Sequence, residues 1–408
     1  MKTNWPTTPK DPALFPKRAG PTGQEKLGEV CEFVRSGITP FDGEKEYIDT
    51  NSVQDFSIVK SQKITYEKRP SRANMEAKTN DVLVAKMKDT LKVYLATLKD
   101  EKRRVFSTGF FISRPKKNFI EPKYLFLYYS SNLFQNLKDE LARGSTQKAI
   151  NDEKLKKYFE IPLPPIKIQK QIVARIEKLF EKIDKAKELR RRAQEQTANI
   201  FTAALREIFL DTKKKKWQSD RIRNLIENIQ TGTTPPSKVR KYYNGNIQWF
   251  TPGDLGNNKF LTSSARTITK IAVKEGKTRL FKKGTLLFVG IGATLGKVGI
   301  ANKEVSANQQ ITGLYFKKLI IPEFVYYWFL YNYDYIRSIS PSATLPILNQ
   351  EGLKDLIINF PSLSEQKKIV VYLDSLREKV DKLKQFQQSQ LKELTELKQS
   401  ILAKAFKG

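Results

Sequence analysis

Three charged side chains in this chain have the spacing of a metal-dependent nuclease core. Asp254 precedes Glu275 and Lys277, and in such enzymes carboxylates hold Mg²⁺ while a lysine positions the attacking water. A similar but less regular spacing of such residues begins at Asp55, earlier in the chain. Charged residues make up 29% of the sequence, so triplets of this kind arise easily by chance. A Mg-dependent DNA nuclease that uses these three residues is therefore kept as an alternative hypothesis.

The sequence lacks the residues that several other catalytic mechanisms require. The sequence has no histidine and a single cysteine, Cys31. Mechanisms that need a histidine base are excluded, and neither a disulfide nor a cysteine zinc site can form within one chain. The segment GIGATLGKV resembles a phosphate loop, but Ile291 and Val298 replace the first glycine and the Ser/Thr that G-x-x-x-x-G-K-[ST] requires. We interpret this segment as a flexible glycine hairpin and predict no metal or cofactor.

The charge balance points to a polyanionic partner. The 408 residues include 74 basic and 43 acidic ones, which gives a net charge of +31. Such an excess is typical of nucleic-acid binding. A thermophilic composition raises glutamate together with lysine, so it does not by itself create the excess.

The start of the sequence, residues 1–25, is proline-rich and polar, and we interpret it as a tail rather than a secretory signal. The most apolar run, residues 319–329, contains Pro322 and Glu323 and is too short to span a bilayer. We therefore expect a cytoplasmic protein with no membrane partner.

Long segments of the chain occur twice. KLGEVCEFVRSGITP, from Lys26 to Pro40, returns as RIRNLIENIQTGTTP, from Arg221 to Pro235. LPPIKIQKQIV, from Leu163 to Val173, returns as FPSLSEQKKIV, from Phe360 to Val370. A duplication of this length predicts two similar domains related by a pseudo-two-fold axis.

The elements that would position functional residues follow from local patterns. β-rich runs alternate with turn clusters over residues 26–160 and again over 213–358, which predicts an α+β domain in each copy. Aromatic-rich helices are expected over 123–137 and 322–335. Their aromatic rings could stack on unpaired bases, but at this density, with Leu and Val between them, we favour a place in the core.

Each copy ends in a long helix, predicted over residues 161–212 and 359–408. Apolar residues recur at heptad spacing in both, with Thr197 in one seam and Gln387 and Gln390 in the other. A helix this long needs a partner to cover its seam. Pairing within the chain makes the two helices antiparallel, with the glutamines setting the register; a parallel coiled coil between two chains is the alternative.

Taken together, two domains that are each followed by a long helix beginning P-x-x-x-x-Q-x-x-I-V resemble the specificity subunit of a type I restriction–modification enzyme. The resemblance covers nearly the whole chain from Lys26. Its most telling segments are GTTPP at Gly232, IQWFTPGDL at Ile247, GATLGKVGI at Gly292 and PSLSEQKKIV at Pro361. The first copy departs from this pattern, with YIDTNSV at Tyr47 and KMKDTLKV at Lys86. Such divergence is expected if each domain reads a different sequence.

The resemblance implies a function. Members of the family recognise a bipartite, asymmetric sequence in double-stranded DNA, one half per domain, with the paired helices as a ruler. They dock two adenine-specific methyltransferase (M) subunits and ATP-dependent restriction (R) subunits, and they catalyse nothing themselves. In agreement, the sequence contains neither an NPPY- nor a DPPY-type tetrapeptide.

Candidate DNA contacts lie in loop-like segments. Lysines would neutralise phosphates, while Arg, Asn and Gln can read base edges in the major groove. For each of them a solvated surface position is the alternative. The candidates are Lys86, Lys88, Arg143, Gln147 and Lys148 in the first copy, and Lys238, Arg240, Lys241, Lys297, Asn308, Gln309 and Gln310 in the second.

Overall fold

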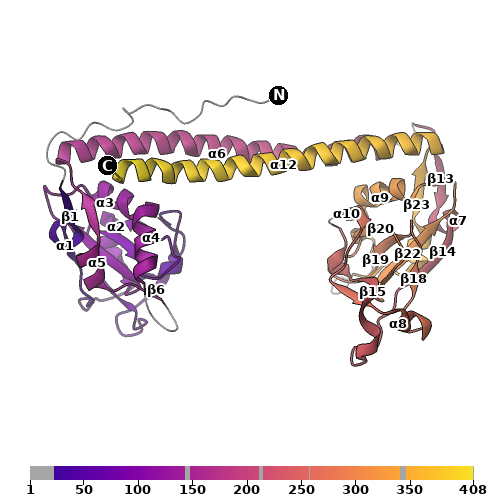
Figure 1. Cartoon of the computed structure of the whole chain (residues 1–408), viewed down its shortest axis with the longest axis horizontal. Helices are drawn as coiled ribbons and strands as arrows, with labels where there is room; N and C mark the ends of the chain where they lie inside the picture. Colours follow the sequence, from indigo (N-terminus) through magenta and orange to yellow (C-terminus); the bar gives the residue numbers. More distant parts are fainter. Residues whose placement is uncertain (1–22, 143–147, 211–214, 257, 341–345, 408) are drawn as a thin grey trace. The chain divides into compact units, whose positions relative to one another are not determined.

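The computed structural model describes residues 23–142, 148–210, 215–256, 258–340 and 346–407. The chain divides into two compact units, residues 1–190 with 388–408 (unit 1) and residues 191–387 (unit 2). Each unit holds one globular domain and a part of both long helices (Figure 1). We name the globular part of unit 1 domain 1 (residues 24–162) and that of unit 2 domain 2 (residues 218–360). Most of the predicted tail, residues 1–22, lies outside the described residues.

Domain 1 is built on two four-stranded sheets. In the first, the order is β6 (Gln62–Ile64), β3 (Lys45–Ile48), β10 (Arg104–Ser107) and β7 (Ala73–Met75), with β10 parallel to β3. In the second, the order is β2 (Cys31–Phe33), β11 (Phe110–Pro115), β8 (Val82–Ala85) and β9 (Val93–Leu95), all antiparallel. Two short pairs complete the strands: β1 (Gln24–Lys26) with β12 (Glu160–Pro162), and β4 (Val53–Gln54) with β5 (Ser57–Ile58).

Domain 2 repeats the topology of both four-stranded sheets, with one strand added to the second, and the pair β4–β5 has no counterpart among its described strands. Its first sheet has the order β17 (Arg266–Ile268), β15 (Tyr243–Phe250), β21 (Val305–Ala307) and β18 (Leu280–Phe281), with β21 parallel to β15. Its second has the order β14 (Ile226–Thr231), β22 (Ile311–Phe316), β19 (Leu286–Val289), β20 (Val298–Ala301) and an added edge strand, β16 (Phe260–Leu261). β13 (Gln218–Arg221) pairs with β23 (Ile357–Phe360) as β1 does with β12. The predicted duplication is confirmed.

Short helices fill the connections between these strands. In domain 1 they are α1 (Leu27–Val30), η1 (Thr50–Ser52), α2 (Leu98–Arg103), α3 (Pro122–Tyr129), α4 (Asn132–Leu141) and α5 (Asp152–Tyr158). In domain 2 they are α7 (Ile222–Leu225), η2 (Arg240–Tyr242), η3 (Pro252–Asp254), α8 (Lys270–Lys274), α9 (Pro322–Tyr331), α10 (Tyr333–Ser338) and α11 (Gln350–Asp355).

The aromatic segment of each copy forms two helices, where the sequence predicted one. The first helix begins at a proline in both domains, Pro122 and Pro322, which suits the first turn. In domain 1, Oγ of Ser131 accepts a hydrogen bond from N–H of Phe134 and thereby caps a second helix. In domain 2 the break falls at Asn332, whose Nδ2 donates to the carbonyl of Trp328 at 2.9 Å. A count of apolar residues detects neither break.

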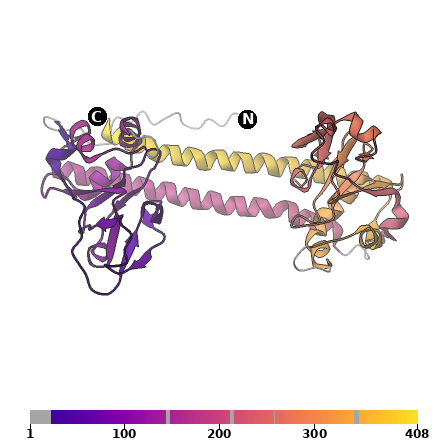
Figure 2. The same ribbon diagram turned by 90° about the horizontal axis from the view of Figure 1, so that it is seen from below.

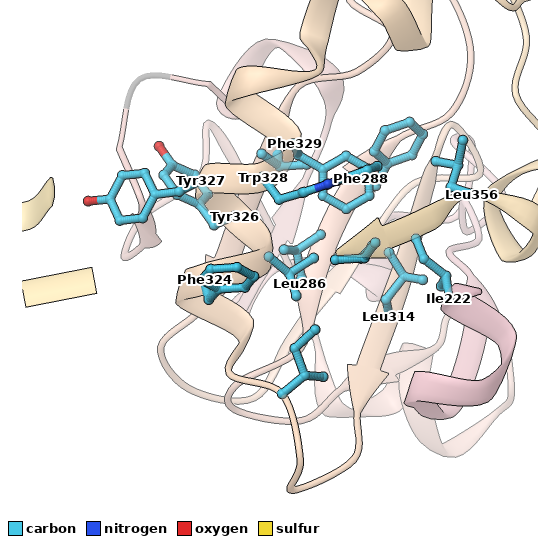
Figure 3. Packing of buried hydrophobic residues seen from close by; sticks show 14 of the residues in the cluster. Ile222, Leu286, Phe288, Leu314, Phe324, Tyr326, Tyr327, Trp328, Phe329 and Leu356 are labelled. Atoms are coloured by element: carbon cyan, nitrogen blue, oxygen red, sulfur yellow. The ribbon is translucent and has the colours of Figure 1, made fainter. Parts of the chain in front are cut away.

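Most aromatic residues of these helices lie in the cores, and Tyr335 of α10 is an exposed exception. Tyr124, Tyr128 and Tyr129 are buried in domain 1, and Figure 3 shows Tyr326, Tyr327, Trp328 and Phe329 of α9 packed beside strand residues of domain 2. The hydroxyls of Tyr124 and Tyr128 donate to the carbonyls of Pro162 and Glu160. These rings are therefore core residues and do not form a surface on which bases can stack.

Two helices of 44 residues follow the domains, α6 (Ile166–Phe209) and α12 (Leu363–Phe406). Each begins directly after a proline-containing segment, since proline is excluded from a helix interior. Oγ of Ser362 accepts a hydrogen bond from N–H of Glu365, 3.4 Å away, which supports the first turn of α12.

The glutamine of the repeated P-x-x-x-x-Q motif fastens each long helix to its own domain. Gln169 is fully buried; Oε1 accepts from N–H of Glu121 (2.9 Å), and Nε2 donates to the carbonyls of Phe119 (3.0 Å) and Pro164 (2.8 Å). Gln366 makes the same three bonds in unit 2, with N–H of Ile321 (2.9 Å) and the carbonyls of Leu319 (3.2 Å) and Pro361 (2.9 Å). The glutamine that is repeated in the sequence thus makes the same connection between long helix and domain in both units.

Within each unit the two long helices run antiparallel, as predicted. In unit 1 the last turns of α12 lie beside the first half of α6 (Figure 2), and Lys398 pairs with Asp184 at 2.6 Å. Phe406 packs on Tyr124, with ring centroids 5.0 Å apart. In unit 2 the buried Gln387 donates from Nε2 to Oγ1 of Thr197, 3.0 Å away.

Some seam positions expected from the heptads are exposed. Ile200, Leu383 and Leu397 are each at least 40% exposed. Near Ile200 the reason is visible, because Phe201 and Leu205 pack into the core of domain 2 instead. The apolar surface of each helix is therefore shared between the other helix and the adjoining domain, which a pure coiled-coil pattern does not describe. No helix of the described residues is long and apolar enough to cross a membrane.

Candidate nucleic-acid interface

Three segments of domain 2 meet at one corner, which contains several of the candidate contacts. N–H of Gly290, at the end of β19, donates to the carbonyl of Gln310 at 2.8 Å. The carbonyl of Gly290 accepts from N–H of Leu348 (2.9 Å), and N–H of Gly292 donates to the carbonyl of Pro346 (2.9 Å). We call this arrangement, with residues 290–297, 308–312 and 346–351, the loop corner of domain 2.

Domain 1 has the same corner with different side chains. N–H of Lys86 donates to the carbonyl of Gly109 (2.9 Å), and the carbonyl of Lys86 accepts from N–H of Ile150 (3.1 Å). N–H of Lys88 donates to the carbonyl of Lys148 at 2.9 Å. Lys86, Lys88 and Lys148, which were proposed separately from the sequence, are therefore neighbours in the fold. Arg143 and Gln147 lie outside the described residues.

The glycine-rich segment of domain 2 is a hairpin between the antiparallel strands β19 and β20. Gly292 and Gly296 have φ of +100° and +91°, values that favour glycine. The N–H groups of Gly290, Gly292, Gly296 and Lys297 all donate to carbonyls of the chain itself. They are consequently not available as a phosphate cradle, and they hold in place a loop that the sequence suggested to be flexible.

A basic side chain fixes this loop in each domain. In domain 1 the fully buried Lys138 donates from Nζ to the carbonyls of Met87 (2.9 Å) and Thr90 (2.8 Å). Burial lowers the pKa of Lys138, and the neighbouring Asp139, at 3.3 Å, opposes that shift. In domain 2 Nη1 of Arg337 donates to the carbonyl of Ala293 at 2.8 Å. Both residues therefore hold the loop in place through hydrogen bonds to its backbone carbonyls.

The amide side chains of domain 2 have different environments. Asn308 is only 7% exposed; its Nδ2 donates to Oε1 of Gln310 (3.0 Å), and its Oδ1 accepts from N–H of Gln310 (3.1 Å). Gln309 is exposed, and its Oε1 accepts from the hydroxyl of Thr234. Asn308 therefore orients Gln310, while Gln309 and Gln310 present their remaining amide atoms.

Gly232, the first residue of GTTPP, permits this turn to approach. A Cβ at this position would clash with the carbonyls of Ala307 and Asn308. N–H of Gly232 also donates to the carbonyl of Ile311 at 2.9 Å. The motif thus has a structural reason: only glycine leaves room for the turn that carries Gln309 and Gln310.

The basic candidates around η2 are exposed. Lys238, Arg240 and Lys241 all face solvent, whereas Lys297 is partly buried with its stem against Gly256. Nζ of Lys241 donates to Glu275 at 2.7 Å, and this hydrogen bond raises the pKa of Lys241.

The two carboxylates of the nuclease hypothesis have structural roles in the fold. Oδ2 of Asp254 accepts from N–H and Oγ1 of Thr251 (2.8 and 2.7 Å), and Oδ1 accepts from N–H of Ala265 (2.9 Å). Glu275 pairs with Lys241 and accepts from the hydroxyl of Tyr242 at 2.7 Å. Among the described residues, no three His, Cys, Asp or Glu side chains form a group that could hold a metal ion. Asp254 stabilises a turn.

The same turn occurs in domain 1 with the two roles exchanged. There Asp49 precedes the 3₁₀ helix, and its Oδ1 accepts from N–H and Oγ of Ser52, both at 2.8 Å. In domain 2 the hydroxyl residue comes first and the aspartate last. The departure of YIDTNSV from the second copy therefore preserves the turn.

Sequence reasoning missed four residues that belong to the loop corners or hold their loops: Lys138, Arg337, Asp152 and Gln350. Asp152 and Gln350 are equivalent, because each follows an asparagine, Asn151 or Asn349, whose side chain caps the next helix. Extending the alignment of RGSTQKAIN with SATLPILN by one residue would have paired Asp152 with Gln350. Lys138 and Arg337 gave no comparable signal.

Comparisons with known proteins agree with this architecture. The family model of the type I restriction modification DNA specificity domain matches residues 23–194 and again 214–393. The MjaIX specificity subunit of Methanocaldococcus jannaschii is 36% identical over 171 residues, which are 40% of this chain and 39% of that protein. The EcoBI specificity subunit of Escherichia coli is 25% identical over 61% of this chain and 58% of its own length. The chain thus spans about two fifths and three fifths of these two relatives. The putative MjaX specificity subunit of M. jannaschii is 22% identical over 92% of this chain and 91% of its own length.

Two solved structures share the fold over nearly the full length. A chain from work on complex assembly and conformational transition of the type I R-M system has a TM-score of 0.77 and 26% identity, covering 96% of this chain and 99% of its own. The HsdS subunit from Thermoanaerobacter tengcongensis has a TM-score of 0.62 and 26% identity, covering 97% and 98%. The chain therefore belongs to the DNA specificity subunits of type I restriction–modification systems, whose role is target recognition and not catalysis.

Proposed function

We propose that this subunit reads a bipartite, asymmetric target in double-stranded DNA, with one half-site for each domain. The observation that carries the proposal is the pair of loop corners. Their backbone hydrogen bonds are the same, but lysines in domain 1 stand where glycines stand in domain 2, at Lys86/Gly290 and Lys88/Gly292. A common framework with different side chains is suited to reading two different sequences.

The chemistry of the two corners supports different kinds of contact. In domain 1, Lys88 and Lys148 would neutralise phosphates, with Arg143 and Gln147 as further candidates on the same segment. Lys86, which is paired with Asp152 at 3.3 Å, would contact a phosphate by exchanging that partner. In domain 2, Gln309 and Gln310 would read base edges, with Asn308 holding Gln310. Lys238, Arg240, Lys241 and Lys297 would contact the backbone of the DNA.

We further propose that α6 and α12 set the spacing between the half-sites, and that the subunit docks two adenine-specific methyltransferase subunits and ATP-dependent restriction subunits in the cytoplasm. Support comes from the relatives, which are subunits of type I restriction enzymes. The globular domains at residues 26–160 and 213–358 would then each recognise one half-site, and each is followed by one spacer helix.

Selection of bound sequences from a randomised pool of DNA duplexes tests whether each domain recognises one half-site. The full chain, bound to its methyltransferase subunits, should select two defined half-sites. Gln309→Ala should relax one or two base positions in one half-site, each by about 1–3 kcal/mol. Lys88→Ala should weaken binding to all sequences alike, because a phosphate contact carries no base information. Lys102→Ala, an exposed lysine of α2, is the matched control. A single half-site, or relaxation in both halves by Gln309→Ala, would contradict the proposal.

Shortening both helices tests the spacer. The segments Lys187–Ala193 and Leu391–Leu397 are one heptad each. In both helices the segment lies between the Asp184–Lys398 and Thr197–Gln387 contacts, so deleting both segments leaves these contacts in place. A heptad shortens a helix by roughly 10 Å and keeps the seam in phase. The half-sites should persist while the bases between them become fewer. An unchanged spacer in a folded, active variant would limit the helices to docking.

A further inference from the structure

Domain 2 contains a cavity of about 350 Å³ at its loop corner. Gly290 is among its lining residues, and the polar ones are Thr231, Gln309, Gln310, Thr312, Asn349, Gln350 and Glu351. At Gly290 an added Cβ would meet the carbonyl oxygen of Leu348 at 3.1 Å, Thr312 and Gln310 being somewhat further away. The absence of a side chain at this glycine therefore helps to keep the cavity open.

The equivalent positions in domain 1 carry large, paired side chains. The backbone ladders make Lys86 the counterpart of Gly290, and the strand registers make Phe111 the counterpart of Thr312. Nζ of Lys86 lies 4.6 Å from the centroid of the Phe111 ring and 3.3 Å from Oδ1 of Asp152, the counterpart of Gln350. The duplication has thus produced an open polar site in one domain and an ion pair over an aromatic ring in the other.

The amide atoms around the cavity have a defined pattern. Gln309 and Gln310 use Oε1 within the protein, as acceptors from Thr234 and Asn308. Gln350 uses Nε2, which donates to Oγ1 of Thr231 at 2.8 Å. Within the described part of the chain, the amino groups of Gln309 and Gln310 and Oε1 of Gln350 have no protein partner. Because Gln309, Gln310 and Gln350 all line the cavity, its lining has both hydrogen-bond donors and an acceptor available.

We propose that this cavity receives the major-groove edge of a single adenine in the half-site of domain 2. Adenine presents an acceptor, N7, next to a donor, N6, which match the amino group of Gln310 and Oε1 of Gln350. Guanine would place two acceptors there, with O6 against Oε1. This inference rests on the proposed function, and it names the residues that distinguish the two domains.

A free adenine nucleotide has the same base edge, but the cavity suits it poorly. Among the described residues, the lining has no lysine or arginine and includes Glu351. The lining residues that the structure describes therefore offer a phosphate group no cation, whereas in duplex DNA the phosphates lie away from the base edge. The occupant we infer is a base of the DNA target.

The test is to fill the cavity with the side chain that domain 1 has. Gly290 has no left-handed backbone angle, so Gly290→Lys requires only a small shift of the Leu348 carbonyl. Gln350→Leu removes the acceptor without adding charge. Gly253→Lys adds the same charge to domain 2 where a Cβ meets only Oγ1 of Thr251, at 4.0 Å. Thermal unfolding of each variant, compared with the parent, establishes that it is folded.

Selection from a randomised duplex pool, with the full chain in its methyltransferase complex, gives the readout. The parent and Gly253→Lys should prefer adenine at one position of one half-site by about tenfold or more. Gly290→Lys and Gln350→Leu should abolish that preference and leave the other half-site unchanged. Retention of the preference in both folded variants, or a different base at the position that they affect, would overturn the inference.

Two further outcomes have separate meanings. If the parent selects no half-sites at all, the proposed function itself fails. If the parent selects two half-sites and Gly290→Lys leaves both unchanged, only the role of the cavity in adenine recognition is rejected. Calorimetric titration of the complex with ATP and with adenosine, without DNA, should show no binding that depends on Gly290. Such binding would assign the cavity to a free nucleotide or nucleoside instead of DNA.

Discussion

Replacement of Gln366 by leucine should strongly destabilise unit 2, because one buried side chain there satisfies three backbone groups. Leucine leaves the N–H of Ile321 and the carbonyls of Leu319 and Pro361 without partners. At about 1–2 kcal/mol for each unsatisfied group, the free energy of unfolding should fall by about 3–6 kcal/mol.

Glutamate at the same position provides a pH-dependent version of the test. One carboxyl oxygen can still accept from N–H of Ile321, but the other must face two carbonyls, so burial and repulsion favour the protonated acid. The pKa is then raised above its unfolded value of about 4.3. Gln366→Glu should accordingly be closest to the parent at and below that pH, where the acid is protonated in both the folded and the unfolded chain. It should lose about 1.4 kcal/mol per pH unit above it, until the folded pKa is reached.

Urea unfolding followed by tryptophan fluorescence can measure this in the full chain. Of the four tryptophans, Trp217, Trp249 and Trp328 belong to unit 2, and Trp5 lies outside the described residues. Gln385→Leu, at an exposed position of the same helix, is the matched control. The twin variant Gln169→Leu should leave the tryptophan transition in place and increase amide exchange in domain 1.

Two results would refute this reasoning. A loss below about 1 kcal/mol for Gln366→Leu would mean that the backbone groups find other partners. A loss for Gln366→Glu that does not vary with pH would mean that the carboxylate stays solvated, contrary to the burial of the site.

Three other predictions follow from the same structure. Burial raises the pKa of Cys31 to about 12, so the thiol stays protonated and enclosed at pH 8 and a disulfide reagent should react with it only in denaturant; fast reaction of the native chain would contradict this. Gln387→Leu should raise the stability of unit 2 by about 1 kcal/mol, since a seam glutamine sets register at the expense of stability, and a lower melting temperature by circular dichroism would contradict that role. If about 6–10 phosphates are neutralised, the affinity for DNA should fall with a log–log salt slope of roughly −5 to −9, whereas a slope near −1 would show that the +31 charge does not serve DNA binding.

The sequence was sufficient to predict the duplication, the long helices and their antiparallel pairing. These features depend on repeated segments and on the periodic placement of apolar residues such as Ile176 and Leu373, both of which can be read locally. Most of the aromatic residues were also correctly assigned to the core, with Tyr335 as an exposed exception. The same reasoning could not divide the aromatic segment into two helices, because the break depends on a cap at Ser131.

The loop corners were less accessible to sequence reasoning. Asn308 was selected as a base reader by its type, but its exposure and its bond to Gln310 depend on strands that are distant in sequence. The cavity of domain 2 requires Gly290, Thr312 and Gln350 to meet, and the three positions lie on separate segments. The repeat could align each pair of residues, but only the fold shows that the differences combine at one place.

The composition of unit 1 affects how the protein is made. Unit 2, residues 191–387, is one continuous stretch, whereas unit 1 needs residues 388–408 in addition to its own first 190. Ile401, Leu402 and Phe406 lie in the core cluster of domain 1, with Phe406 against Tyr124 and Tyr128. During synthesis, domain 1 emerges from the ribosome first and yet lacks this cover until all of unit 2 has followed. Domains usually complete their folding in the order of translation; here the second unit can close before the first, and the nascent first domain keeps an apolar surface that a chaperone could bind in the interval.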